Sequence, residues 1–102
     1  MIIPKKGVKK KYIIWGTGLS GSFIADAVES SGAKLMFSID SDKAKEGSNF
    51  YGITTYQPDY LKNHMDEFDY MIIGHYSRFE EIKQQAIDIG VPKEKIIMPY
   101  EV

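Results

Sequence analysis

The sequence contains no cysteine, only two histidines and one tryptophan among its 102 residues. The lack of cysteine excludes disulfides and thiolate metal sites, and two histidines offer little for a structural metal site. Long hydrophobic runs are also missing, because no apolar segment approaches the roughly 20 residues that a membrane-spanning helix needs. These absences predict a small chain that holds no metal, has no membrane partner and works in a reducing cytoplasm.

Acidic residues dominate once the amino-terminal segment is set aside. Five of the 13 basic residues lie at positions 5, 6, 9, 10 and 11, so residues 12–102 carry eight basic against 14 acidic side chains, a net charge of −6. Lysines stand where a signal peptide would have its apolar region, and we interpret residues 1–10 as a basic leader or linker and residues 11–102 as one domain. A domain of this charge would repel a phosphate backbone, so no nucleic-acid partner is expected.

Strand-like and helix-like segments alternate along the chain. Apolar runs predict strands over residues 11–15, 33–39, 52–56, 68–74 and 95–99. Helical spacing predicts one helix from Leu19 to just before Gly32 and another over 79–89, with a short helix beginning at Pro58. This order predicts an α/β domain with a doubly wound, parallel five-stranded sheet in the strand order 3-2-1-4-5 and helices on both faces.

Both longer helices repeat apolar residues on one face, which we interpret as core. These residues are Leu19, Phe23, Ile24, Ala27 and Val28 in the first helix and Phe79, Ile82, Ala86 and Ile89 in the second. A further aromatic group, Phe50, Tyr51, Tyr56 and Tyr60, lies around the third strand. We expect it to cover a sheet edge, with stacking on a nucleotide base as the alternative.

Glycines at the spacing G-x-G-x-x-G follow the first strand, in the segment IIWGTGLSGSFIADAV at residues 13–28. In such a corner Gly16 permits the tight turn, Gly18 leaves room for a phosphate, and Gly21 lets the helix lie close to the sheet. The helix start offers free backbone N–H groups to an anion. The hydroxyl groups at the same corner belong to Thr17, Ser20 and Ser22. The alternative is a plain strand-to-helix turn that binds nothing.

Asp40 follows the second strand, nineteen residues after Gly21. Dinucleotide-binding folds place at this distance the acid that accepts hydrogen bonds from ribose hydroxyls. The strand, the turn, the helix and the acid together favour a nucleotide ligand. In the alternative interpretation, Asp40 and Asp42 only cap a loop.

Polar residues also follow the fourth strand, in the segment IIGHYSRF. Parallel sheets bind ligands at the carboxyl ends of their strands, so we expect His75, Ser77 and Arg78 to face the same crevice as the glycine loop. Arg78 could pair with a phosphate through two hydrogen bonds, and His75 could contact the ligand or carry a proton. Alternatively, His75 and Ser77 cap the next helix and Arg78 is solvated.

Three segments, KYIIWGTGLSG, LMFSIDSDKAKEGSNFYGITTYQPDYL and DYMIIGHYSRFEEIKQQAIDIGVPKEKII, together resemble the small Rossmann-like domains of bacterial surface-carbohydrate enzymes. Such domains occur in nucleotide-sugar dehydratases and epimerases of polysaccharide biosynthesis, at the N-terminus of sugar acyltransferases, and appended to sugar methyltransferases. The resemblance covers residues 11–98 and implies a domain that holds NAD or the uridine-diphosphate part of a UDP-sugar. It implies no complete catalytic machinery, because the acyltransferase His before the third glycine is Ser20 here and no tyrosine has a lysine four positions on.

The sequence therefore predicts a nucleotide or sugar-nucleotide binding module of bacterial surface-carbohydrate metabolism. It would act as a homodimer or as a domain of a longer chain. The alternative is an interaction or dimerisation domain of the same fold that binds no small molecule. A third hypothesis is a minimal NAD-dependent enzyme completed by a partner chain.

Overall fold

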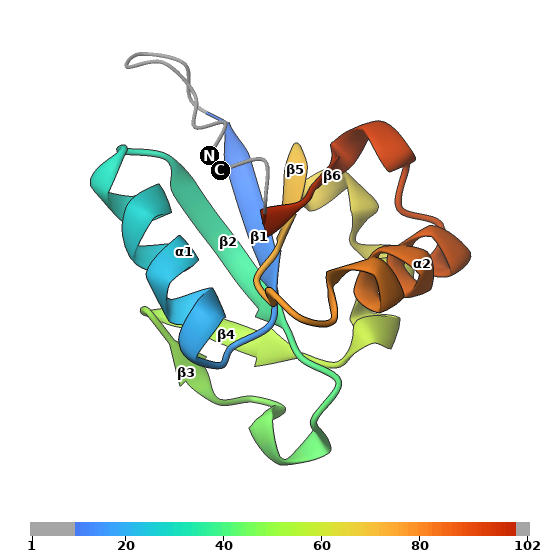
Figure 1. Cartoon of the computed structure of the whole chain (residues 1–102), viewed down its shortest axis with the longest axis horizontal. Coiled ribbons are helices and arrows are strands. Elements are labelled where there is room, and N and C mark those ends of the chain that lie inside the picture. The colour runs from blue at the N-terminus through green and yellow to red at the C-terminus, as the bar shows by residue number, and fades with distance from the viewer. Residues whose placement is uncertain (1–9, 100–102) are drawn as a thin grey trace.

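Strand β1 (Lys11–Trp15) lies inside a six-stranded sheet in the computed structural model, which describes residues 10–99 (Figure 1). The other strands are β2 (Lys34–Ile39), β3 (Asn49–Phe50), β4 (Ile53–Tyr56), β5 (Tyr70–Ile73) and β6 (Ile96–Ile97). Their order across the sheet is β3-β4-β2-β1-β5-β6, and every neighbouring pair is parallel except β3 and β4. The predicted α/β fold and the predicted order of the five parallel strands are confirmed.

The additional strand, β3, lies between the predicted strands 33–39 and 52–56 and pairs antiparallel with β4. A two-residue turn joins them, in which Tyr51 and Gly52 both have positive φ angles of 52° and 81°. The side chain of Asn49 accepts a hydrogen bond from the N–H of Gly52 at 3.2 Å. Because β3 has only two residues, it is too short for an alternating apolar pattern to predict it.

Helices cover the two faces of the sheet (Figure 1). One face carries α1 (Leu19–Ser30), and the other carries α2 (Phe79–Ile89) together with a 3-10 segment, Pro58–Asn63, where the short helix was expected. Side chains of β1 alternate between these layers, since Tyr12 and Ile14 pack on the α1 side while Ile13 and Trp15 pack on the α2 side. No helix within residues 10–99 is long and apolar enough to cross a membrane.

The buried face of α1 differs from the predicted one. Leu19 and Phe23, expected in the core, are 75% and 65% exposed. The residues that face the sheet are Gly21, Ile24, Ala25 and Val28, which follow the spacing i, i+3, i+4, i+7. The helix is turned this way because Gly21 packs directly on the backbone of Gly16, and a larger residue could not take that place.

The aromatic group around β4 divides between the two layers. Phe50 is buried with the α1-side core, while Tyr51 at the turn is 40% exposed. Tyr56 and Tyr60 stack with their ring centroids 3.7 Å apart and pack against the α2-side core. Tyr56 and Tyr60 therefore serve mainly as core, whereas only Phe50 and Tyr51 lie at the sheet edge.

Candidate functional site

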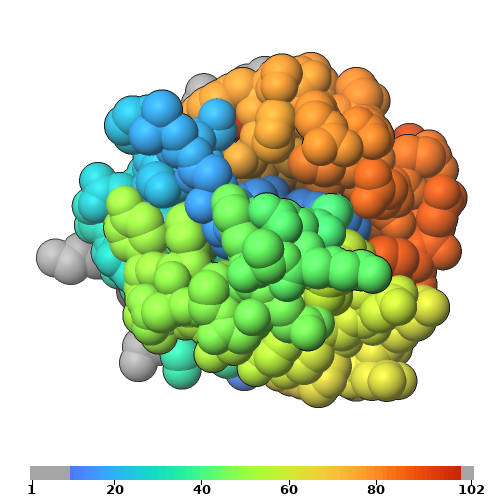
Figure 2. Space-filling view, turned by 90° about the horizontal axis from the view of Figure 1, so that it is seen from below, coloured from blue at the N-terminus to red at the C-terminus, as the bar shows by residue number. Residues whose placement is uncertain are grey.

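The carboxyl ends of β1, β2 and β5 meet at one edge of the sheet and bring the predicted loops together. A cavity of about 200 Å³ opens there, and it brings together Gly16, Thr17, Gly18, Asp40, His75 and Arg78. Figure 2 shows this hollow between the start of α1, the loop after β2 and the segment that leads into α2. Ser20, Gly21, Ser22 and Ser77 were also predicted at the site but do not line the cavity.

Two of the loop glycines are required by close contact between backbone segments. Gly16 has a φ of +118°, and a Cβ atom there would lie 2.8 Å from the carbonyl oxygen of Gly74. A Cβ atom on Gly21 would lie 2.0 Å from the carbonyl oxygen of Gly16. The first turn of α1 thus packs backbone to backbone against the ends of β1 and β5, a contact that only glycine permits.

Gly18 is different, because nothing in the fold requires it to be a glycine. Its φ is −83°, a value open to any residue, and a Cβ atom there would meet no heavy atom within 4 Å. It precedes α1, where no side chain caps the helix start. The first helical hydrogen bond runs from the Ser22 N–H to the Gly18 carbonyl at 3.0 Å, so the N–H groups of residues 18–21 precede the helical ladder.

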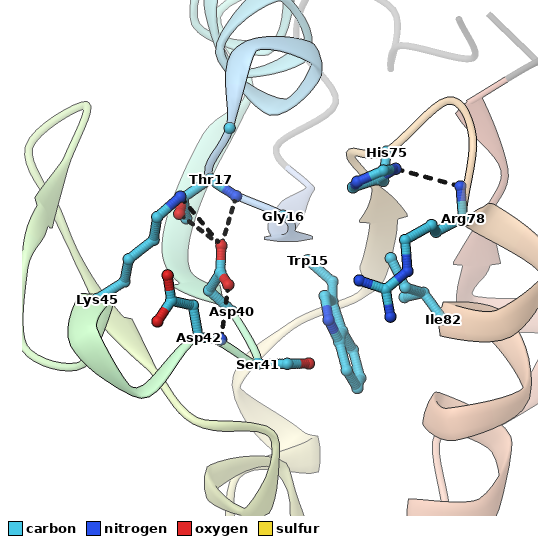
Figure 3. A pocket seen from close by; sticks show the side chains of 11 residues that line it. Trp15, Gly16, Thr17, Asp40, Ser41, Asp42, Lys45, His75, Arg78 and Ile82 are labelled. Carbon is cyan, nitrogen blue, oxygen red and sulfur yellow. Dashed lines mark hydrogen bonds and ion pairs between the residues drawn. The ribbon is translucent and has the colours of Figure 1, made fainter.

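Asp40 ties the glycine loop to the segment that follows β2 (Figure 3). Its Oδ2 accepts hydrogen bonds from the Thr17 N–H at 3.1 Å and the Thr17 Oγ1 at 2.7 Å. Its Oδ1 accepts one from the Asp42 N–H at 2.9 Å, and the Lys45 Nζ lies 3.7 Å from Oδ2. Asp40 is therefore both a loop cap and a link to Thr17, and its Oδ1 retains acceptor capacity for a further donor.

The charge of Asp40 is stabilised by these contacts. Burial raises its pKa, but the hydrogen bonds from Thr17 and Asp42 and the nearby Lys45 outweigh burial, so the pKa lies below the ordinary aspartate value. A carboxyl whose pKa is lowered on folding stabilises the fold at pH values above its unfolded pKa and loses that contribution as pH falls through the folded one. At neutral pH Asp40 therefore presents a full negative charge to the cavity.

The opposite wall of the cavity is the β5–α2 corner. His75 Nδ1 lies 3.2 Å from the Arg78 N–H, which donates to it, and 3.3 Å from Ser77 Oγ. Arg78 donates from Nε and Nη2 to the two carboxylate oxygens of Glu81, each at 2.9 Å. His75 therefore accepts a hydrogen bond at the start of α2 and also lines the cavity, while its contact with a ligand stays a prediction.

Lys45 and Ile82 also line the cavity, although neither was among the site residues predicted from the sequence. Lys45 lies in the 3-10 segment Lys43–Lys45, which reaches the cavity because Asp42 caps it by accepting the Ala44 N–H at 3.0 Å. An aspartate three residues before a lysine is too common a loop pattern to reveal this placement. Within residues 10–99 no group of three or more His, Asp or Glu side chains could hold a metal ion.

The fold and this edge define a Rossmann-like α/β domain, in which the glycine loop, the acid after the second parallel strand and the crevice occupy their usual relative places. The chain belongs to the family described as C2185-like, N-terminal, whose family model matches residues 8–97. No curated protein matches the chain.

Solved structures of the same fold include UDP-D-quinovosamine 4-dehydrogenase from Vibrio fischeri. It is 22% identical, with a TM-score of 0.72, and the match covers 89% of this chain and 78% of that one. RSP, a Rex-family repressor, is 16% identical with a TM-score of 0.67, and the match covers 88% of this chain and 51% of that one. At these identities the likeness shows the fold.

RSP has been solved with β-NADH and with β-NAD⁺ and operator DNA. The matched segment spans 52% and 49% of those two chains. Nucleotide-binding proteins therefore share this fold. Because one of these neighbours also binds DNA, the absence of a nucleic-acid partner for the present chain stays a prediction.

Proposed function

We propose that the chain is a nucleotide-binding module whose ligand is NAD or a UDP-sugar, held at the carboxyl edge of the sheet. A role in bacterial surface-carbohydrate metabolism is part of the proposal, and the fold shared with a UDP-sugar dehydrogenase supports it. The proposal assigns binding and no reaction to the chain.

The observation that carries the proposal is the open space at Gly18. The close contacts of Gly16 and Gly21 explain those glycines without any ligand, but no contact explains Gly18. A glycine beside unpaired helix N–H groups lets a phosphate reach the backbone, as in dinucleotide-binding loops. Two cations, Lys45 and Arg78, line the same cavity and can offset the phosphate charge.

The first expected result is a local response of the glycine loop to nucleotides. In an ¹H–¹⁵N NMR titration, the amide signals of residues 16–22 should shift with NAD(H) or a UDP-sugar, because a bound phosphate would accept their hydrogen bonds. Signals of Gly32 and Gly90, on other loops, serve as internal controls. If no nucleotide shifts the 16–22 amides at millimolar concentration, the nucleotide-binding proposal is wrong.

A second candidate function, an interaction or dimerisation domain, is favoured by the exposed apolar side chains of α1. Leu19 and Phe23 are largely exposed, and Tyr51 is exposed at the turn of the β3–β4 hairpin. Figure 1 places this hairpin next to α1. This function would be favoured if no nucleotide shifts the amide signals of residues 16–22 and light scattering shows a dimer.

For a nicotinamide dinucleotide we expect NAD(H) to bind about tenfold more tightly than NADP(H). Asp40 can accept a ribose hydroxyl at Oδ1, whereas a 2′-phosphate would meet the Asp40 charge at close range. Lys45 offsets the charge of a 2′-phosphate only weakly, because it is already paired with Asp40 and its side chain is 39% exposed. The neighbouring Asp42 adds to the repulsion.

Calorimetry with both cofactors measures this difference. Asp40→Asn and Asp40→Ala should reduce the difference in affinity between NAD(H) and NADP(H), because both remove the negative charge. Asp40→Ala should also weaken binding of either cofactor, because it removes the oxygen that accepts the Thr17 hydrogen bonds. Tighter NADP(H) binding by the unmodified protein would contradict the role of Asp40.

A further inference from the structure

The β5–α2 corner fixes which nitrogen of His75 carries its proton. Nδ1 accepts a hydrogen bond from the backbone N–H of Arg78 at 3.2 Å, and a ring nitrogen that accepts cannot also hold a proton. The neutral imidazole therefore carries its proton on Nε2. Figure 3 shows the edge of the ring away from Arg78 turned across the cavity toward Gly16 and Thr17.

The same corner fixes the guanidinium of Arg78. Glu81 accepts from Nε and Nη2 at 2.9 Å each, so one edge of the planar group is fully paired. The two N–H groups of Nη1 and the second N–H of Nη2 remain, and one N–H from each of these nitrogens points the same way, which forms a second, unpaired edge. In Figure 3 the guanidinium reaches past Ile82 toward Trp15, inside the cavity.

We propose that this corner is an anion subsite in which Glu81 positions Arg78 while the Arg78 backbone N–H positions His75. The free guanidinium edge and the His75 Nε2–H then receive one phosphate group of a nucleoside diphosphate. The identity of this ligand rests on the proposed function. The subsite lies across the cavity from the glycine loop, so a diphosphate would contact both walls.

Glu81 is a positioning residue in this arrangement. Its role can be tested by whether its substitution weakens or strengthens the binding of an anion. Removing its charge makes the cavity more positive, which by itself would strengthen the binding of an anion. Removing its two hydrogen bonds frees the long Arg78 side chain, which must then be ordered when the ligand binds. The pair is about half exposed, with 55% and 54% for the two side chains, so its own Coulomb energy is small and orientation dominates.

Glu80 provides a matched control for the charge. It lies in the same first turn of α2, and its side chain makes no hydrogen bond or ion pair within the described part of the chain. Glu80→Gln and Glu81→Gln remove the same charge from the same helix end, so both change the interaction with the helix dipole alike. Only Glu81→Gln removes the two-point pairing that holds Arg78.

Calorimetry with UDP and with ADP tests the subsite. Glu81→Gln should weaken binding about two- to tenfold, the usual cost of ordering a long side chain, while Glu80→Gln leaves it unchanged or stronger. Arg78→Lys should weaken binding at least as much as Glu81→Gln, because lysine cannot present a planar pair of donors. Equal effects of Glu80→Gln and Glu81→Gln, with the wild type binding, would overturn the subsite alone.

NMR of the free protein tests the corner without any ligand. At about pH 8 the ¹⁵N shifts of the His75 ring should show the proton on Nε2, and Glu81→Gln but not Glu80→Gln should shift the Arg78 Nε–H signal. A proton on Nδ1 would overturn the arrangement whatever the binding data show. A wild type that binds neither UDP, ADP nor NAD⁺ would overturn the proposed function and the subsite's ligand together.

Discussion

Gly21→Ala is expected to destabilise the domain by about 4 kcal/mol or more, a large part of the stability of a chain of this size. The added Cβ atom would lie 2.0 Å from the carbonyl oxygen of Gly16. Carbon and oxygen atoms that are not bonded stay about 3.3 Å apart even in close contacts, so α1 would have to move away from the sheet by about 1 Å. That movement would loosen Ile24 and Val28, which are fully buried on the α1 side of the sheet.

Urea unfolding followed by circular dichroism measures this loss. Gly18→Ala, three residues earlier in the same loop, is the matched control, because its Cβ atom meets nothing within 4 Å. It should unfold within about 1 kcal/mol of the wild type. If Gly21→Ala were as stable as Gly18→Ala, the close packing of α1 on Gly16 would be wrong.

The glycine loop shows how far the sequence could predict this site. The strand, the turn and the helix start follow from local pattern, because an apolar run, a G-x-G-x-x-G spacing and a helical repeat lie next to one another. The contact of Gly21 and Gly16 with Gly74 could not be predicted, since Gly74 is more than fifty residues away and carries no local signal. That contact sets the rotation of α1 and so exposes Leu19 and Phe23.

The contacts of Asp40 and His75 could be predicted from the sequence only in part. Spacing placed both at the carboxyl edge, where they line the cavity. Spacing could not show that Asp40 accepts two hydrogen bonds from Thr17, or that His75 accepts one from the backbone N–H of Arg78. These bonds depend on how two loops approach each other in space. For both residues the sequence offered a cap or a ligand contact as alternatives, and the geometry permits both at once.

The cations at the cavity also have partners within the protein. Lys45 is paired with Asp40 and Arg78 with Glu81, so both cations are already balanced before any ligand arrives. A diphosphate would therefore depend on directed donors more than on net charge. Backbone N–H groups at the start of α1 are such donors, and access to them runs past Gly18.

Gly18→Val is accordingly expected to abolish nucleotide binding while leaving the fold intact. Its φ of −83° and ψ of −160° are extended values that valine adopts, and no heavy atom lies within 4 Å of the place of the Cβ atom. Valine is a poorer residue than glycine before a helix, so stability should fall by about 1 kcal/mol at most. The isopropyl group would occupy the place of the phosphate, and losing two charge-assisted hydrogen bonds of about 1.5–3 kcal/mol each reduces affinity by more than about a hundredfold.

Calorimetry and urea unfolding on the same preparation separate these two effects. Gly18→Ala should give an intermediate affinity, because a methyl group only narrows the approach to the N–H groups. If Gly18→Val unfolds the domain, the fold itself requires glycine at this position. The observation that supports nucleotide binding would then no longer hold. If the folded variant binds nucleotide as tightly as the wild type, the phosphate does not lie at the glycine loop. Loss of binding with the fold retained is the result that the open space at Gly18 predicts.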